Sequence, residues 1–316
     1  HERCMQKHET DGLVVKTQSG FCWVQTKTDL VICQLRGTLK RASKKTELCV
    51  IGDRVIIERL PDGSGVIKQV LPRQRVLSRI EPSEYAGTST EREQVLIANC
   101  DQAVFVSAAA NPAPNTRFLD RCLVAAEKAG IPAVVVLNKI DLVGAEQSRA
   151  LFATYERIGY PVLYVSAVAK IGIQELHDVL LGKISIFTGR SGVGKSSLLN
   201  AIQPDLGRAV GEVSAKLAKG KHTTNYAELV PLIGGGYVAD TPGIRGLGLW
   251  DIEPDELDGY FREFVPHIAH CPFSDCTHIN EPECAVRAAV ARGEIAAHRY
   301  ESYLRLREEL EDQYVY

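Results

Sequence analysis

One glycine-rich segment constrains the fold of this chain more than any other feature of its sequence. It follows an apolar run at residues 184–188 and fits the spacing G-x4-G-K-[ST], with one further serine before a helical pattern: Gly189, Arg190, Ser191, Gly192, Val193, Gly194, Lys195, Ser196 and Ser197. Glycines at this spacing let backbone N–H groups turn toward phosphates, and the start of the following helix attracts negative charge. The segment therefore predicts a strand, a phosphate-binding loop and a helix in that order.

Apolar runs and amphipathic stretches alternate on both sides of this loop. Residues 117–130 place Leu119, Cys122, Leu123 and Ala126 at helical spacing, and the pattern stops at a glycine followed shortly by a proline. Short apolar runs that read as buried strands are residues 103–107, 133–137, 162–165, 184–188 and 237–239. Strands alternating with helices predict an α/β domain, in which a mostly parallel sheet is covered on both faces.

A nucleotide in the loop requires groups for its phosphates and its metal ion. We expect Lys195 to reach the β- and γ-phosphates and Ser196 to bind Mg²⁺. Asp240 and Gly243 belong to an Asp-Thr-Pro-Gly sequence directly after the apolar residues 237–239. Alone this sequence could be an ordinary turn. Its position about 45 residues after Ser196 favours a functional role, in which Asp240 supplies a second carboxylate for Mg²⁺ and the Gly243 N–H contacts the γ-phosphate.

A second motif indicates which base the site reads. Asn138, Lys139, Ile140 and Asp141 directly follow the strand expected at residues 133–137. The Asp141 carboxylate can accept hydrogen bonds from N1–H and the 2-amino group of guanine, and adenine offers neither donor. We expect Asn138 to bond to the purine edge, the Lys139 stem to pack beside the ring, and the backbone at Ser166 and Ala167 to donate to guanine O6. Together with the phosphate loop, the motif selects GTP over ATP.

The order of these motifs is unusual. In ordinary small GTPases the phosphate loop comes first and the guanine-reading motif follows. Here residues 138–141 and 166–167 precede the loop at 189–196, and residues 240–243 come last. The same sheet can form if the chain is circularly permuted, because chain ends lie at the surface and the order of strands in space need not change.

The first 80 residues have a different character. Short strands are expected at residues 12–16, 21–25, 30–35, 54–59 and 65–70, which suits a small barrel of the oligonucleotide-binding (OB) kind, although an SH3-like barrel would read much the same. These 80 residues contain 15 Lys and Arg against 8 Asp and Glu, whereas the rest contain 22 against 31. A basic loop at residues 40–45 adds to the indication of polyanion binding. The polar residues 72–95 read as a linker.

The region after residue 250 reads as helical, with stretches at residues 255–265 and 285–312. Between them lie four metal-ligand side chains within 14 residues: Cys271, Cys276, His278 and Cys284. Three thiolates and one imidazole suit a closed, tetrahedral, structural Zn²⁺ site. His267 and His270 compete as ligands, and the alternative to a metal site is three buried thiols beside a surface histidine. The other six cysteines are scattered and read as reduced core residues rather than disulfides.

With these motifs in this order, the sequence resembles the ribosome small-subunit-dependent GTPase A family, circularly permuted bacterial GTPases that act in small-subunit maturation. The resemblance implies an OB-fold barrel at residues 1–79, a permuted P-loop GTPase domain at 80–250 and a helical zinc-binding domain at 251–316. It also implies binding of GTP and GDP with Mg²⁺, one structural Zn²⁺ per chain, and GTP hydrolysis stimulated by the small ribosomal subunit, whose rRNA the protein contacts. We expect a cytoplasmic monomer. The sequence contains no run of about 18 apolar residues, so we expect no membrane span.

The catalytic group is the least direct of these expectations. Ras-like enzymes orient the attacking water with a Gln just after the D-x-x-G sequence, and here that position is Ile244, which cannot form hydrogen bonds. His222, in the loop between the phosphate motif and Asp240, is the candidate, and the resemblance supports a catalytic role for it. Thr224, or Thr223, would complete the Mg²⁺ shell when GTP is bound. The alternative is that His222 contacts RNA while the ribosome supplies the catalytic group.

Two functions of other classes compete with a GTPase switch. The first is a nucleic-acid-binding scaffold whose nucleotide site is structural, and the complete set of phosphate- and base-contacting residues disfavours it. The second is a P-loop ATPase or kinase, which the sequence at residues 138–141 opposes. Turnover of GTP with and without small subunits separates the three.

Overall fold

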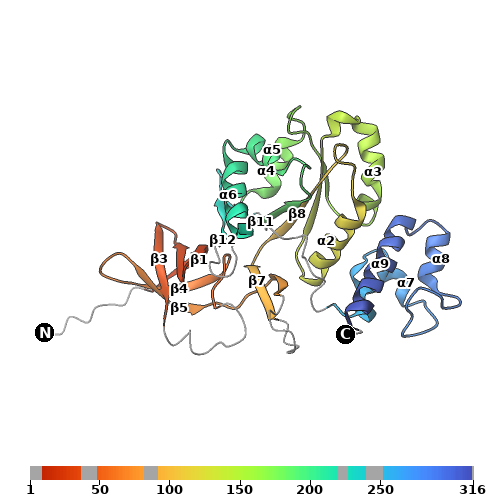
Figure 1. Cartoon of the computed structure of the whole chain (residues 1–316), viewed down its shortest axis with the longest axis horizontal. Helices are drawn as coiled ribbons and strands as arrows, with labels where there is room; N and C mark the ends of the chain where they lie inside the picture. Colours follow the sequence, from red (N-terminus) through yellow and green to blue (C-terminus); the bar gives the residue numbers. More distant parts are fainter. Residues whose placement is uncertain (1–8, 37–47, 82–91, 220–226, 240–251, 315–316) are drawn as a thin grey trace. The chain divides into compact units, whose positions relative to one another are not determined.

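The computed structural model describes residues 9–36, 48–81, 92–219, 227–239 and 252–314. The chain forms two compact units. Figure 1 labels helices and strands of both units. The first combines His1–Gln102, Leu176–Thr188 and Ser196–Gly246, and the second combines Ala103–Glu175, Gly189–Lys195 and Leu247–Tyr316. Among the described residues, none of the helices has the length and apolar character that crossing a membrane requires.

A five-stranded barrel opens the first unit. Its strands are β1 (Glu9–Gln18), β2 (Phe21–Gln25), β3 (Leu30–Leu35), β4 (Arg54–Arg59) and β5 (Gly65–Val70). They follow the order β1-β2-β3-β5-β4, β4 pairs again with β1, and only the β3–β5 pair is parallel. This closed order is that of an OB-fold, so the SH3-like alternative is wrong.

The barrel strands form because apolar side chains alternate with polar ones. On β2 and β3, Cys22, Val24, Val31 and Cys33 are buried while their neighbours point outward. Gly65 lies where strands pass closely, since a Cβ there would stand 2.7 Å from the Cys33 sulfur. The barrel core consists of Val14, Cys22, Val24, Val31, Cys33, Val55, Ile57 and Ile67.

The linker expected at residues 72–95 is wrong at residues 76–81 and 92–95, which form strands. Strand β6 (Val76–Glu81) pairs antiparallel with β7 (Arg92–Ala98). The pairing register of the two strands shifts between Leu77 and Ser78. Leu77 and Ile97 are opposite one another and buried. Because polar residues separate these few apolar ones, the local pattern resembles a linker, and only pairing with a distant segment makes it a strand.

The first unit also contains one part of the α/β architecture. Strand β11 (Ile184–Gly189) lies parallel to β14 (Tyr237–Ala239), which pairs antiparallel with β13 (Val230–Pro231). Helices α5 (Lys195–Ile202) and α6 (Leu206–Lys219) follow β11 in the chain. The short β12 (Ala227–Glu228) pairs with β1, and the Leu229 backbone N–H donates to Val15 O at 2.7 Å. The barrel and this part of the chain therefore share hydrogen bonds.

The second unit contains the rest of the parallel strands, in the order β10-β9-β8. Every residue of β8 (Gln102–Ala108) and β9 (Ala133–Asn138) is buried, as their continuous apolar runs predict. Strand β10 (Val162–Tyr164) completes these strands, and α2 (Thr116–Lys128), η1 (Ile140–Leu142) and α3 (Ala145–Arg157) lie between them along the chain. Helix α4 (Ile173–Leu180) follows β10 and continues into the first unit.

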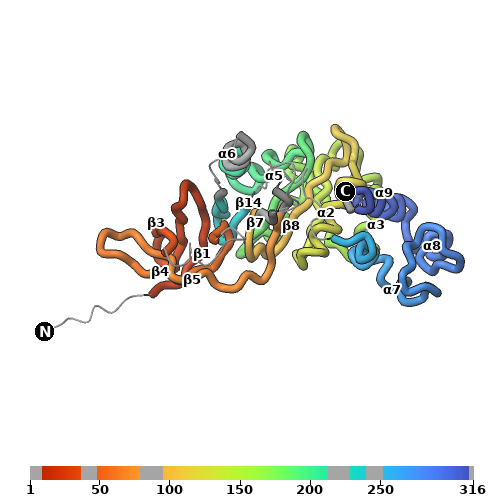
Figure 2. Tube along the Cα trace, turned by 60° about the horizontal axis from the view of Figure 1, so that its bottom comes forward, coloured from red at the N-terminus to blue at the C-terminus, as the bar shows by residue number. Residues whose placement is uncertain are grey.

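The end of the chain is helical, as expected, but more finely divided. It contains η3 (Pro254–Tyr260), α7 (Val265–Ile268), α8 (Ala285–Ala291) and α9 (Ala297–Tyr314), and Figure 2 shows α7 beside α8. The helix expected over residues 285–312 is interrupted at Gly293, whose φ of +76° lies in the left-handed region that ends helices. Phe261, Phe264, Tyr303 and Leu306 belong to the core between these elements.

Candidate nucleotide and metal sites

The phosphate loop has the local structure that its sequence predicts. It begins at the end of β11, and α5 starts at Lys195. Gly192 and Gly194 have φ values of +81° and +95°, and a Cβ on Gly194 would stand 2.4 Å from the Asn138 amide nitrogen. Lys195 Nζ donates to Gly189 O at 2.7 Å and to Arg190 O at 3.3 Å, so the ammonium group lies over the loop.

The motif at residues 138–141, expected to read guanine, is bonded directly to the phosphate loop. Asn138 is buried at the end of β9, and its Nδ2 donates to Val193 O at 2.9 Å. Lys139 Nζ donates to Gly192 O at 2.7 Å and also to Asn111 O. Two adjacent side chains thus connect the two halves of the expected nucleotide site.

A second segment meets the motif from the end of β10. The Ala167 backbone N–H donates to Asn138 Oδ1 at 3.3 Å, and the buried Ser166 hydroxyl donates to Asp141 Oδ1 at 2.6 Å. The side chain of Asp141 is exposed, whereas that of the neighbouring Ile140 is buried. The Ser166 hydroxyl therefore fixes one oxygen of a carboxylate whose side chain remains open to solvent.

The remaining expected nucleotide residues divide into two groups. Ser196 and Ser197 are exposed in the first turn of α5, and Arg190 and Ser191 precede them in the loop. The other group lies outside the described residues: His222, Thr223, Thr224, Asp240, Gly243 and Ile244. The expected catalytic and switch positions thus stay predictions from sequence.

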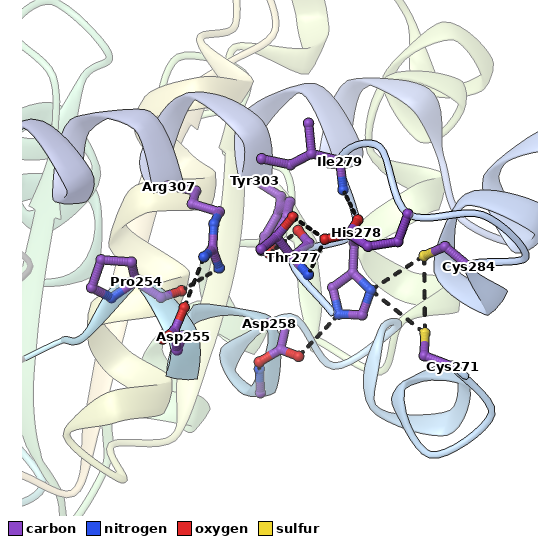
Figure 3. A network of polar contacts seen from close by, with 12 residues as sticks. Pro254, Asp255, Asp258, Cys271, Thr277, His278, Ile279, Cys284, Tyr303 and Arg307 are labelled. Atoms are coloured by element: carbon purple, nitrogen blue, oxygen red, sulfur yellow. Dashed lines mark hydrogen bonds and ion pairs between the residues drawn. The ribbon is translucent and has the colours of Figure 1, made fainter. Parts of the chain in front are cut away.

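The structure brings the four expected metal ligands together. The ligand atoms of Cys271, Cys276, His278 and Cys284 all lie within 4.8 Å of one another. His278 Nδ1 is 3.3 Å from the Cys284 sulfur and 3.6 Å from the Cys271 sulfur, and the two sulfurs are 3.9 Å apart (Figure 3). Two thiolates on a tetrahedral Zn²⁺ stand about 3.8 Å apart, so the donor set fits that ion.

Neither alternative for this segment agrees with the geometry. His278 is fully buried, which opposes the picture of a surface histidine beside three buried thiols. His267 and His270 are not part of the group that the described residues form. Four soft or borderline donors converge on one point, which is the arrangement of a closed structural metal site.

Residues outside the ligand set orient it, and the sequence gives little sign of them. His278 Nε2 donates to Asp258 Oδ2 at 3.0 Å, so Nδ1 faces the sulfurs. The hydroxyls of Tyr300 and Tyr303 donate to His278 O and Thr277 O at 2.6 and 2.8 Å. Asp258 lies 13 residues before the first ligand, at a spacing that matches no motif.

The loop between the ligands is itself held by a carboxylate. Glu281 accepts hydrogen bonds from the backbone N–H groups of Thr277 and Ile279 at 2.7 and 2.9 Å. Desolvation raises the pKa of Glu281, but these bonds and the one from the Thr277 hydroxyl outweigh it and lower the pKa to about 2. The loop is therefore held by an ionised Glu281 at neutral pH.

Comparison with known proteins gives a consistent result along the chain. Residues 70–250 match the family model of the RsgA GTPase, and residues 11–67 match that of the RsgA N-terminal domain. The chain is 42% identical over 301 residues to the small ribosomal subunit biogenesis GTPase RsgA of Carboxydothermus hydrogenoformans, covering 95% of this chain and 97% of that protein. It is 43% identical over 304 residues to the protein of the same name from Gemmatimonas aurantiaca, with the same two coverages.

Two solved structures are similar over nearly the whole chain. The crystal structure of YjeQ from Thermotoga maritima has a TM-score of 0.78 and 39% sequence identity, covering 96% of this chain and 99% of that one. The structure of YloQ, described as a circularly permuted GTPase, has a TM-score of 0.75 and 29% identity, with 99% of each chain covered. The permuted order of motifs read from the sequence is thus shared with a protein of known structure.

Proposed function

Because this chain belongs to the RsgA family of circularly permuted GTPases, we propose that it hydrolyses GTP to GDP and phosphate as a biogenesis factor of the small ribosomal subunit. The observation that carries the nucleotide assignment is the pair of side chains Asn138 and Lys139. Each bonds to a carbonyl of the phosphate loop, at Val193 and Gly192. A site that reads guanine and a site that binds phosphates are therefore one connected structure.

In this proposal the residues of the loop divide the work of binding. The loop N–H groups and the Lys195 ammonium neutralise the β- and γ-phosphates, and the Ser196 hydroxyl binds the Mg²⁺ that accompanies GTP. Asp141, oriented by Ser166, accepts the two donors on the guanine edge. Thr224, Asp240 and Gly243 complete the Mg²⁺ and γ-phosphate contacts.

The attacking water needs a group that orients it. We assign this role to His222, since Ile244 cannot perform it. The rival account places the catalytic group on the ribosome and leaves His222 to contact rRNA. Both accounts agree with a GTPase that is slow alone and stimulated by the small subunit.

The outer face of β2 and β3 supports docking on rRNA. Phe21, Leu30 and Ile32 are 40%, 51% and 46% exposed on this face. Trp23 is directly opposite Ile32, and the Lys16 ammonium lies 5.2 Å from the centre of its ring. The exposed ring of Phe21 and the half-buried ring of Trp23, with a cation beside the second, are suited to stacking on bases near a phosphate backbone.

The proposal also includes a bound metal, the macromolecular partners and the cellular location of the protein. Cys271, Cys276, His278 and Cys284 would bind one structural Zn²⁺, which fixes the loop that carries them. The small subunit and its rRNA are the macromolecular partners, late maturation is the stage, and the protein acts as a monomer in the cytoplasm, where bacterial ribosomes are assembled.

Steady-state turnover with and without purified small subunits tests the proposal. We expect slow hydrolysis of GTP alone, a large increase with subunits, and no hydrolysis of ATP under either condition. Tight GTP binding with no turnover at any subunit concentration would favour the scaffold alternative. Equal turnover of ATP and GTP would contradict the role of residues 138–141.

A further inference from the structure

Arg299 on α9 is a fully buried guanidinium whose side chain has 0% exposure. Its Nη1 donates to Asp120 Oδ1 at 2.7 Å, and its Nε and Nη2 donate to the two Glu263 oxygens at 2.6 and 3.2 Å. Asp120 is also fully buried. An ion network this deep is costly to break, because each charge that loses its partner is left uncompensated in a low dielectric.

Asp120 is satisfied by further donors as well. Its Oδ1 accepts from the Tyr155 hydroxyl at 2.8 Å, and its Oδ2 accepts from the Ser302 hydroxyl at 2.6 Å. Asp120 thus connects α2, α3 and α9, and Arg299 adds Glu263 from the segment before α7. A network with every member paired has one favoured arrangement and resists small displacements of any one helix.

One face of α2 lies across a small cavity from the phosphate loop. Leu119 and Cys122 of α2 line a cavity of about 20 Å³ together with Gly189, Arg190 and Val193. This space holds roughly one water molecule, so the helix and the loop are nearly in contact. A shift of α2 would therefore move the floor of the phosphate loop.

The chain that leads into α2 is bonded to the same loop. Asn111 lies four residues before Asn115, whose side chain caps the helix by accepting from the Phe118 N–H at 2.9 Å. Asn111 O accepts from Lys139 Nζ, which also donates to Gly192 O. Displacement of α2 would thus disturb the bond that connects the base and phosphate subsites.

Helix α9 also holds the metal loop from another side. Tyr300, next to Arg299, donates to His278 O, and Tyr303, one turn further, donates to Thr277 O. The position of α9 is consequently set by the metal loop at one contact and by Asp120 at the other.

We propose that Arg299 is a positioning residue for the nucleotide site, holding α2 beneath the phosphate loop and coupling occupancy of the Cys271–Cys284 metal cluster to guanine nucleotide binding. The proposal rests on the proposed function for its nucleotide and its metal. Metal binding orders the loop that α9 contacts, and Arg299 transmits that order to Asp120. Because such coupling is reciprocal, nucleotide must strengthen metal binding by the same factor by which metal strengthens nucleotide binding.

The test measures two affinities in the full chain. The affinity for a fluorescent GDP is measured with and without Zn²⁺, and the affinity for Zn²⁺ is measured by chelator competition with and without saturating GDP. In the natural sequence we expect each ligand to strengthen the other about tenfold, within the usual range for coupled sites. Arg299→Met should bring both factors close to one, and Arg299→Lys, which keeps the charge, should retain part of the coupling.

The matched control is Arg121→Met. Arg121 also connects α2 to α9, through Glu309 at the protein surface, where its partner is 42% exposed. We expect this variant to keep the full coupling. If Arg299→Met does not fold, Tyr155→Phe and Ser302→Ala each remove one bond to Asp120 and should lower the coupling in the same direction.

The possible results distinguish failure of the coupling from failure of the proposed GTPase function. Failure of the natural sequence to bind any guanine nucleotide would overturn the proposed function and the coupling together. Normal GDP binding that is indifferent to Zn²⁺ would overturn the coupling alone. Equal coupling in the natural sequence and in a folded Arg299→Met variant would remove Arg299 from the connection.

Discussion

At the scale of single residues, Asn138 and Lys139 each serve two structural purposes. Asn138 donates to the phosphate loop through Nδ2 and accepts from Ala167 through Oδ1, so one amide fixes both neighbours of the expected purine edge. Lys139 has a φ of +64°, a backbone conformation that few residues other than glycine adopt. The ammonium group of the same residue donates to Gly192 O, so this strained backbone lies beside the expected nucleotide site.

Asp141 is the residue to which we assign guanine recognition, and changing it should change the preferred base. In Asp141→Asn, an amide can donate to the carbonyl at position 2 of xanthine, whereas it no longer accepts two donors from guanine. Binding assays should show weaker GTP binding and a gain for xanthosine triphosphate. Unchanged GTP affinity with no gain for the xanthine nucleotide would show that Asp141 does not read the base.

His222→Ala tests the catalytic assignment. A group that orients water acts mainly in the transition state, so we expect hydrolysis on the small subunit to fall while GTP affinity stays nearly unchanged. Subunit binding in the presence of a non-hydrolysable GTP analogue is the accompanying measurement, and it should be normal. A parallel loss of binding and hydrolysis would instead identify His222 as a docking residue.

At the scale of elements, the metal loop depends on η3 and α9 for its shape. Asp258 comes from η3 and orients His278, and the tyrosines of α9 hold the backbone beside that histidine. Most of the residues between the ligands are polar, so we expect these hydrogen bonds and a bound metal to hold the loop in shape. This arrangement explains why three cysteines lie in a polar segment.

Removing one ligand should therefore remove the metal and the order of the loop. Metal analysis of the natural sequence should find about one Zn²⁺ per chain, and Cys276→Ala should lose it and reduce helicity in the C-terminal region. Structural Zn²⁺ contributes on the order of 10 kcal/mol to the folding of small sites. Full helicity and solubility in the metal-free natural protein would show that the thiols are not ligands.

Asp258→Asn is a finer change to the same element. The amide cannot match the carboxylate as an acceptor for His278 Nε2–H, so Zn²⁺ affinity should fall about 10- to 100-fold. Asp255→Asn is the matched control, because Asp255 lies on the same short helix but pairs with Arg307 and is 88% exposed. Equal Zn²⁺ affinities in the two variants, measured by chelator competition, would contradict an orienting role for Asp258.

At the scale of the whole molecule, the sequence predicts what is written locally and misses what is paired at a distance. The barrel strands, the parallel strands and the four-ligand cluster follow from alternation, apolar runs and spacing. The β6–β7 pair does not, since Leu77 and Ile97 form one surface only after two segments meet. Asp120, Glu263 and Arg299 are equally hidden, because charged residues far apart in sequence carry no sign that they will be buried together.

The barrel face gives the prediction that involves the whole molecule. If Trp23 and its neighbours stack on rRNA, Trp23→Ala should weaken binding to the small subunit and reduce the stimulated rate of GTP hydrolysis. Loss of one stacked base typically costs about 1–3 kcal/mol, which is roughly a five- to 150-fold decrease in affinity. The rate without subunits should not change, because Trp23 is on the barrel, whereas the residues assigned to guanine and phosphate are at positions 138–141, 166–167 and 189–197. Ile233→Ala is the control, since that side chain is 71% exposed and lies in the turn between β13 and β14, outside the barrel strands. A Trp23→Ala variant that binds subunits normally, or one that loses its basal turnover as well, would mean that this face is not the rRNA contact.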